Sequence, residues 1–319
     1  MFDIQAEDRF YENKFYFSYS GLNKLLYSPS IFYKHYILNQ QEERTDTHLV
    51  EGRLLHCLLL DADAFDKQFI LSSGSVPSGP SKVVIDRVFR SAVEQRRTDE
   101  SIKNFDSEIL DILREINFHQ RLKTDEQRLE KILTDDAISY FEFLKNRSGK
   151  DIIDEDMYNR AKDSVEVIRS NKMAMETLSG DHVESEVMLN CTFKDYPFGI
   201  KGIVDRIIVR DSKITICDLK TTGKTISDFA DSVEYYNYWM QAAMYAELVG
   251  CTKQIDPSEI SFSFLVIDKY QQVYVFDVEK NTMLLWREKL RNKLEVAKYH
   301  YDNRYYALPY EFATGKITL

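Results

Sequence analysis

Two apolar, β-branched runs in the middle of the chain lead into charged residues that are poorly suited to a structural core. The first run leads directly into Asp205, and the second, 214–217, leads into Asp218 and Lys220. Residues two apart on a strand point to the same face, so Asp218 and Lys220 must emerge side by side. The intervening residues, 206–212, carry Asp-Ser at a turn, which predicts a hairpin that brings both aspartates together. Two carboxylates and an ammonium at one sheet edge are suited to a divalent-metal site.

The order of helical and strand-like periodicity predicts an α/β or α+β fold, in which a small sheet is flanked by helices. Helical spacing dominates 83–178, and strands dominate 184–218. A long helix, a strand pair and a closing helix are expected at 233–249, 260–267 with 272–278, and 282–299. We expect one domain over 1–319, with 75–170 as a mostly helical insertion within it.

Charge and hydropathy limit the class of protein. The formal net charge of −10 disfavours a protein that coats nucleic acid nonspecifically, but it allows an enzyme with a local basic cleft. No apolar run approaches the roughly 18–20 residues that span a bilayer. The acidic N-terminus lacks the basic and apolar regions of a signal peptide, so we expect a cytoplasmic protein.

The cysteines are scattered singly along the chain, at Cys57, Cys191, Cys217 and Cys251, with no Cys-x-x-Cys pair. This spacing argues against a zinc ribbon and against a disulfide framework. We expect them to be small, buried apolar residues, with Cys217 on the side of its strand opposite Asp218.

A leucine-rich helical segment, 49–60, contains Gly52 and, one turn later, His56. His56 is either a core histidine bonded to a backbone carbonyl or, as a neutral imidazole, an additional metal ligand. Glycine within a helix costs about 1 kcal/mol relative to alanine, so Gly52 suggests the close approach of another backbone.

Further candidates lie on the first strand and on the long helix. Glu184 and Glu186 flank the start of an apolar run, where each is either a solvated strand entrance or a group facing the metal, and Glu186 is preferred. Gln241 and Tyr245 lie one helical turn apart and share a face. The aromatic residues just before them either belong to the core, as expected for most, or stack on bases; they are Tyr235, Tyr236, Tyr238 and Trp239.

Basic and hydroxyl residues could form a phosphate-binding rim. Thr221, Thr222 and Lys224 follow the Asp-x-Lys strand and supply hydroxyls, backbone amides and a cation. We expect them to bind DNA together with Arg53, Lys201 and Arg206, although each alone could be an ordinary surface residue.

These motifs, taken in order, resemble the PD-(D/E)-x-K nuclease superfamily in its RecB/RecE-like branch. That branch has a G-x-x-x-H helix, an isolated Glu, a G-x-x-D-[RK] strand end, a D-x-K strand and a Q-x-x-x-Y helix. The corresponding positions here are Gly52 with His56, Glu186 (or Glu184), Gly202 with Asp205 and Arg206, Asp218 with Lys220, and Gln241 with Tyr245. Ser18-Tyr19-Ser20 and the segment 305–310 also look like the exonuclease VIII-like phage recombination enzymes.

The resemblance implies a restriction-endonuclease-like core and a role for each matched residue. His56, Asp205, Asp218 and the Leu219 carbonyl would ligate Mg²⁺ or Mn²⁺. Lys220 would activate or position the attacking water, and Glu186 would assist at the metal. Gln241 and Tyr245 would fix their helix beside the site and contact the DNA backbone. The reaction would be in-line hydrolysis of a DNA phosphodiester that leaves a 5′-phosphate.

The leading expectation is a phage-type recombination exonuclease that digests double-stranded DNA ends for a single-strand annealing partner. A structure-selective or single-strand endonuclease is the enzyme alternative. The alternative that is not an enzyme is a non-catalytic DNA-binding or assembly module. The presence of Asp205, Asp218 and Lys220 argues against this alternative. The resemblance also allows a ring-shaped homo-oligomer. No iron–sulfur cluster is expected, because the cysteine set that holds one in some relatives is absent.

Overall fold

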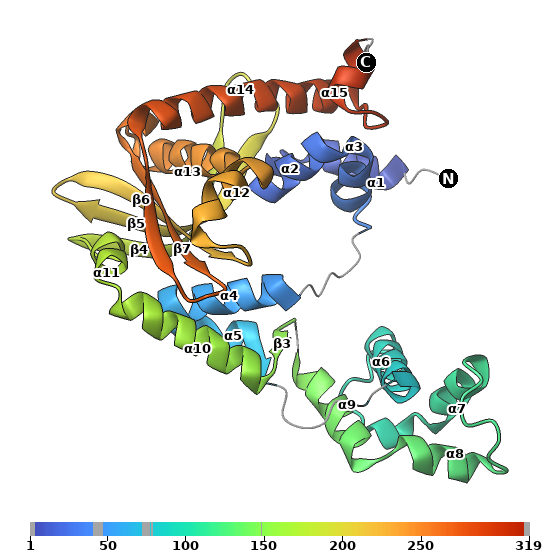
Figure 1. Ribbon diagram of the computed structural model, residues 1–319. Helices are drawn as coiled ribbons and strands as arrows, with labels where there is room; N and C mark the ends of the chain where they lie inside the picture. Colours follow the sequence, from blue (N-terminus) through green and yellow to red (C-terminus); the bar gives the residue numbers. More distant parts are fainter. Residues whose placement is uncertain (1–3, 41–46, 72–76, 78, 148, 316–319) are drawn as a thin grey trace. The chain divides into compact units, whose positions relative to one another are not determined.

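The computed structural model describes residues 4–40, 47–71, 77, 79–147 and 149–315 (Figure 1). The chain divides into two compact units, Met1–Ala62 with Lys162–Leu319, and Asp63–Ala161. The first unit contains the main sheet, and the second is mostly helical.

The main sheet is mixed. Its strands are β1 (Tyr16–Phe17), β4 (His182–Thr192), β5 (Gly199–Arg210), β6 (Lys213–Thr222), β7 (Ser261–Asp268) and β8 (Val273–Val278), in the order β1-β5-β6-β7-β8 with β4 also paired to β5. The β1–β5 and β6–β7 pairs are parallel, and the β4–β5, β5–β6 and β7–β8 pairs are antiparallel. Helices cover both faces, so the predicted small mixed sheet flanked by helices is confirmed.

Each face of the sheet has its own core. One core contains side chains of α2 (Tyr19–Tyr27), α13 (Tyr238–Lys253) and α14 (Lys280–Asn303), and the other contains side chains of α4 (Thr47–Leu60) and α11 (Lys172–Leu178). In Figure 1, α13 and α14 lie on one side of the strands and α4 lies on the other. The remaining helices of this unit are α1 (Ile4–Glu12), α3 (Pro29–Phe32), α12 (Phe229–Tyr235), α15 (Tyr310–Thr314) and the end of α10 (Glu155–Ser170).

Local sequence signals explain several helix boundaries. Ser18 caps α2 by accepting a hydrogen bond from the Gly21 amide, as its position predicts. Pro29 occupies the first turn of α3, where a missing amide proton costs nothing. The helix then continues as a π-helical turn, Tyr33–Ile37.

The β5–β6 hairpin is longer than its sequence suggested. The prediction placed the turn region at 206–212, whereas β5 continues to Arg210 and pairs with Lys213. Only Asp211 and Ser212 form the turn, and both have left-handed backbones, with φ of 47° and 60°. A two-residue hairpin turn of type I′ requires a positive φ at both positions.

The expected single helix over 233–249 is in fact two helices. α12 ends at Tyr235 and α13 begins at Tyr238, because Asn237 adopts a left-handed conformation with φ of 58°. The apolar spacing continues across this break, so periodicity alone did not reveal it.

The second unit packs its helices around its own core. It contains α5 (Phe65–Gln68), α6 (Gly79–Glu94), α7 (Asp106–Glu115), α8 (Asp125–Ile132), α9 (Asp135–Arg147) and the start of α10. Its largest buried side chains include Phe105 and Phe141. A short parallel pair, β2 (Phe69–Leu71) with β3 (Asp151–Ile153), was not predicted. The unit spans Asp63–Ala161, whereas the sequence places a helical insertion at 75–170.

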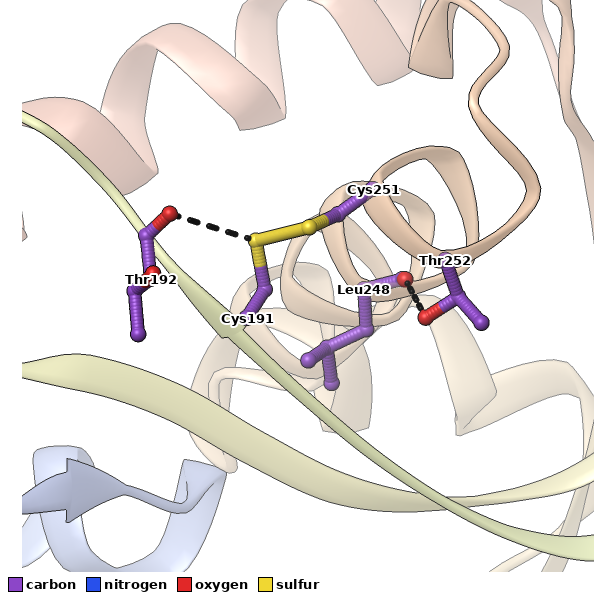
Figure 2. Close-up of a disulfide and its surroundings, with 5 residues drawn as sticks. All are labelled: Cys191, Thr192, Leu248, Cys251 and Thr252. Carbon is purple, nitrogen blue, oxygen red and sulfur yellow. Dashed lines mark hydrogen bonds between the residues drawn. A yellow bond between two sulfur atoms is a disulfide. The ribbon is translucent and has the colours of Figure 1, made fainter.

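The expectation that no cysteines pair was wrong. Cys191 on β4 and Cys251 on α13 form a disulfide, with their Cα atoms 6.3 Å apart (Figure 2). These residues are far apart in the sequence, and packing of the helix on the strand brings them together. Cys57 and Cys217 are buried free thiols, as expected. Cys217 packs in the core on the α4 side of the sheet, whereas its neighbour Ile216 packs in the opposite core.

Among the described helices, none combines the length and apolar content that a membrane span requires.

Candidate active site

An imidazole and two carboxylates converge at the centre of the sheet. His56 Nδ1 lies 3.5 Å from Asp205 Oδ2 and 3.7 Å from Glu186 Oε1. One potential ligand atom from each of these residues falls within 4.8 Å of the others. The three residues come from α4, β4 and β5, and we call them the His56 cluster.

The two strands of the cluster both depart from regular geometry at this point. Val204 and Ile207 pack in the same core, although residues three apart on a regular strand face opposite sides. The alternation of β5 is therefore broken at Asp205 or Arg206. Glu186, which lies opposite Asp205 in the β4–β5 register, has a left-handed backbone with φ of 50°. Such backbones are rare outside glycine and concentrate at functional sites.

The backbone of Leu219 links His56 to Asp205. The Leu219 amide donates a hydrogen bond to Asp205 Oδ2 at 2.8 Å, and the Leu219 carbonyl lies 3.0 Å from His56 Nε2. A carbonyl can only accept, so Nε2 must carry a proton. In the neutral ring the lone pair of Nδ1 therefore faces the two carboxylates, as it would face a cation bound among them.

The negative charges of the carboxylates around His56 favour a positive charge on or beside its ring. Burial lowers the pKa of His56, but the neighbouring Asp205 and Glu186 carboxylates outweigh burial and raise that pKa overall. Glu186 Oε1 is buried and has no hydrogen-bond partner of regular geometry among the described residues. An imidazole nitrogen and two carboxylates, one of them with a buried oxygen that lacks a hydrogen-bond partner, fit a hard divalent cation.

Asp218 and Lys220 form a second pair beside the cluster. Asp218 is fully buried, and its Oδ2 lies against the Lys220 ammonium. Neither carboxylate oxygen of Asp218 makes a hydrogen bond of regular geometry. Burial raises the pKa of Asp218 to about 6, with a further contribution from Asp205 and opposition from Lys220. Burial lowers the pKa of Lys220, but the Asp218 and Asp205 charges outweigh it, so that pKa is raised overall.

The Asp218 carboxylate is therefore not one of the three groups that converge at His56. The sequence placed Asp218 there as a ligand and placed Glu186 as an assisting group. In the structure Glu186 is part of the cluster, and Asp218 is paired with Lys220. Glu184, the alternative to Glu186, instead pairs with Lys253.

Gln241 and Tyr245 share a face of α13, as their spacing predicts. Gln241 Nε2 donates a hydrogen bond to the Tyr245 hydroxyl at 2.9 Å, and Gln241 Oε1 is buried without a partner. Burial raises the pKa of Tyr245 well above its usual range, with contributions from Asp218 and Asp205. A Cβ on Gly202 would lie 2.8 Å from the Tyr245 ring, so this close approach requires glycine.

The prediction that another backbone approaches Gly52 closely was wrong. A Cβ at Gly52 would meet only Thr221 Oγ1, at 3.7 Å, which is ordinary van der Waals contact. Within the part of the chain that the structure describes, no backbone atom lies within 4 Å of that Cβ position, apart from the helix's own.

The residues predicted to bind DNA have different surroundings. Arg53, Lys201, Thr221 and Lys224 are exposed, and the Thr222 hydroxyl accepts a hydrogen bond from the Lys224 amide. Arg206 does not belong to an exposed rim. Its guanidinium is half-buried and donates to the Leu178 carbonyl and the Ser185 hydroxyl. Two of its donors thus link α11 and β4 to β5, and its role in DNA binding stays a prediction.

Tyr19 and Tyr238 also lie near the Asp218–Lys220 pair, although neither was predicted to belong to the site. Lys220 Nζ lies 4.9 Å from the centroid of the Tyr238 ring. Burial raises the pKa of the Tyr19 hydroxyl, with contributions from Tyr238 and Asp218, which places Tyr19 near the same charges. The Ser18-Tyr19-Ser20 motif was the only available signal for Tyr19.

Comparison with known families agrees with this geometry. Residues 16–311 match the model of the PD-(D/E)XK nuclease superfamily. The chain belongs to this superfamily. Members are nucleases that use divalent metal ions, with DNA as the implied substrate. No curated protein matches the chain significantly.

Solved structures with a similar arrangement include an exonuclease candidate from Eubacterium rectale, at 13% identity and a TM-score of 0.47. That match covers 92% of this chain and 86% of the other. A second structure, of a protein called SSO0001, has 13% identity and a TM-score of 0.23, covering 79% and 88% of the two chains. At these TM-scores the similarity adds nothing to the family assignment.

Proposed function

We propose that this PD-(D/E)XK protein is a Mg²⁺- or Mn²⁺-dependent deoxyribonuclease, and specifically an exonuclease that digests double-stranded DNA ends in phage-type recombination or repair. The observation that carries the proposal is the convergence of His56, Glu186 and Asp205 beside the Asp218–Lys220 pair. The family assignment is to nucleases, whose reaction is hydrolysis of a phosphodiester bond.

The residues that would hold the metal are His56 through Nδ1, Asp205 and Glu186, with Asp218 as a further ligand expected from the family motif. The Leu219 carbonyl, also expected there as a ligand, lies on the Nε2 side of the His56 ring. When bound, a divalent ion would lower the pKa of a water molecule and stabilise charge on a phosphate oxygen. Glu186 Oε1 and Asp218 Oδ1, which are buried without a hydrogen-bond partner among the described residues, support this assignment.

The protein's own groups would orient the substrate around that centre. The Lys220 ammonium, held by Asp218 and by the ring of Tyr238, is placed to stabilise negative charge that develops on a phosphate. Tyr245, which accepts a hydrogen bond from Gln241, packs against β5 at Gly202 and so holds α13 beside the strands.

Two other functions are distinguished from the exonuclease by experiment. A structure-selective or single-strand endonuclease would use the same residues but would not require an end. A non-catalytic DNA-binding or assembly module would not need the acid–lysine pair, whose retention favours an enzyme.

The proposal includes the biological setting expected from the resemblance. The partner would be a single-strand annealing protein, and the assembly would be a homo-oligomeric ring. The protein would be located in the cytoplasm, which would be that of the host if the protein is phage-encoded. Disulfides are rare in that compartment, so the redox state of Cys191 and Cys251 in the cell tests the location.

A timed digestion tests the reaction. End-labelled linear duplex and covalently closed circular DNA of the same sequence are incubated with Mg²⁺, with Mn²⁺ or with a chelator. We expect metal-dependent loss of the linear substrate and survival of the circle. Cutting of the circle would replace the exonuclease with the endonuclease, and the absence of any hydrolysis would contradict both enzymes.

A further inference from the structure

A corner of exposed aromatic side chains lies beside the candidate active site. Tyr235 and Tyr236 occupy the break between α12 and α13, where Asn237 is left-handed. These two tyrosines are 76% and 45% exposed. The sequence placed most of the aromatic residues of this segment in the core, and Trp239 is indeed buried.

Hydrogen bonds to neighbouring elements fix the corner. The Tyr19 hydroxyl on α2 donates to the Tyr236 carbonyl. The Asn237 side chain donates to Asn23 Oδ1 at 2.8 Å and accepts from Trp239 Nε1 at 3.1 Å. The backbone that carries the exposed rings is therefore held in place before any ligand binds, which lowers the entropy cost of binding.

A continuous series of ring contacts connects the corner to the candidate active site. Lys220 Nζ lies 4.9 Å from the centroid of the Tyr238 ring, and Tyr238 stacks on Tyr236 with centroids 5.4 Å apart. Tyr236 contacts Tyr235 edge to face at 4.8 Å, and Lys224 Nζ lies 5.8 Å from the Tyr235 ring. A lysine therefore lies at each end of the series, with aromatic faces between them.

We propose that Tyr235 and Tyr236 form a stacking platform for unpaired bases of a single DNA strand whose phosphate lies at Lys220. This inference rests on the proposed nuclease function and adds a substrate class to it: DNA ends that carry a single-stranded tail or are frayed. Aromatic rings stack on the faces of nucleobases, and only unpaired bases expose those faces fully. The lysine ammoniums match the charge of the adjoining phosphates.

A binding experiment tests the platform independently of cleavage. Tyr235→Ala/Tyr236→Ala is compared with Tyr235→Phe/Tyr236→Phe, all on the Asp218→Asn background with Ca²⁺ so that the DNA stays intact. The probes are a duplex with a single-stranded tail, which carries 2-aminopurine near the junction, and a blunt duplex of the same sequence. Both the affinity and the 2-aminopurine fluorescence, which stacking quenches, are measured.

We expect the alanine pair to weaken binding of the tailed duplex about 5- to 150-fold, the range expected for the loss of one stacked base. The fluorescence change should also be lost, and blunt-duplex affinity should change less than about twofold. The phenylalanine pair should retain both readouts, because the rings remain. Phe312→Ala is the matched control, since it removes an exposed ring on α15, well separated from α12 in Figure 1.

Unchanged binding of the tailed duplex by the alanine pair would overturn the platform. An equal loss on the blunt duplex would also overturn it, because the tyrosines would then contact duplex DNA. If the platform is present but the wild-type protein cuts no DNA with Mg²⁺ or Mn²⁺, the nuclease proposal alone is contradicted.

Discussion

At the scale of single residues, the balance of charge at Asp218 is the most consequential feature. Its carboxylate is completely buried and depends on Lys220 for compensation. An isosteric amide keeps the shape and removes the charge that holds the ammonium in position. Asp218 is therefore a residue whose chemistry can be removed with little change in packing.

We expect Asp218→Asn to reduce DNA hydrolysis at least about 100-fold, because it disturbs the group that stabilises developing charge. DNA binding should remain within a few-fold of wild type. The measurement is digestion of end-labelled duplex beside a binding titration. Asp211→Asn at the β5–β6 turn is the control, since asparagine tolerates its left-handed backbone. Full cleavage by Asp218→Asn would remove Asp218 from the site.

Two glycines in the first unit provide a matched pair of substitutions. Gly202→Ala would place a Cβ 2.8 Å from the Tyr245 ring and should displace that ring and lower activity about tenfold or more. Gly52→Ala would meet only Thr221 Oγ1 at 3.7 Å and should leave the fold intact, or stabilise α4 by up to about 1 kcal/mol. Cleavage rates and urea midpoints of both variants check this contrast, and equal effects would contradict it.

A buried histidine away from the site predicts a pH-dependent stability. Burial lowers the pKa of His300, and its Nδ1 contacts the Tyr305 carbonyl. The unfolded chain therefore binds a proton more readily than the native protein. The stability that the neutral, buried His300 contributes should be fully present above the pKa of about 6.5 of an unfolded histidine. It should decrease as the pH falls below that value.

Urea unfolding at pH 8 and pH 5.5 measures this effect. Wild type should lose more stability between the two pH values than His300→Asn, which cannot take up the proton. An identical loss in both proteins would show that His300 is not the responsible group.

At the scale of elements, the disulfide joins β4 to α13, the helix that carries Gln241 and Tyr245. Cys191 and Cys251 are separated by 60 residues, and the chain-entropy treatment of such a loop gives about 4 kcal/mol of stabilisation. Cys251 is exposed, so serine is tolerated there sterically.

We therefore expect Cys251→Ser to lower the free energy of unfolding by about 4 kcal/mol in oxidising buffer. In reducing buffer the variant and wild type should unfold at similar denaturant concentrations. The urea midpoints under both conditions check this, and equal midpoints in oxidising buffer would show that the bond does not form in solution.

At the scale of the whole molecule, a metal that binds only the native arrangement should stabilise the fold. His56, Glu186 and Asp205 come from three different elements, so the unfolded chain does not offer their combined site. At a metal concentration 100 times the dissociation constant, linkage predicts about 2.7 kcal/mol of stabilisation.

Thermal unfolding with and without Mn²⁺ measures this stabilisation. Wild type should unfold at a higher temperature with the metal, and Asp205→Asn should lose most of that increase. Glu184→Gln should retain it, because Glu184 pairs with Lys253 outside the cluster. A metal effect that survives Asp205→Asn would contradict the assigned site.

Contacts within one strand or one helix can be predicted from residue spacing, whereas contacts between elements cannot. The Asp218–Lys220 pairing and the Gln241–Tyr245 contact follow from spacing on one strand and one helix. The division of the predicted 233–249 helix depends on a single left-handed residue, Asn237. The apolar pattern carried no signal of it.

By itself, the sequence determined the class of fold, the order of the family motifs and the residue types at the site. Only the tertiary structure decided that Glu186 joins His56 and Asp205, that Arg206 supports α11, and that two distant cysteines pair. The physical reason is that strand and helix periods fix which residues share a face of one element. The distances between different elements are set by how their side chains pack together.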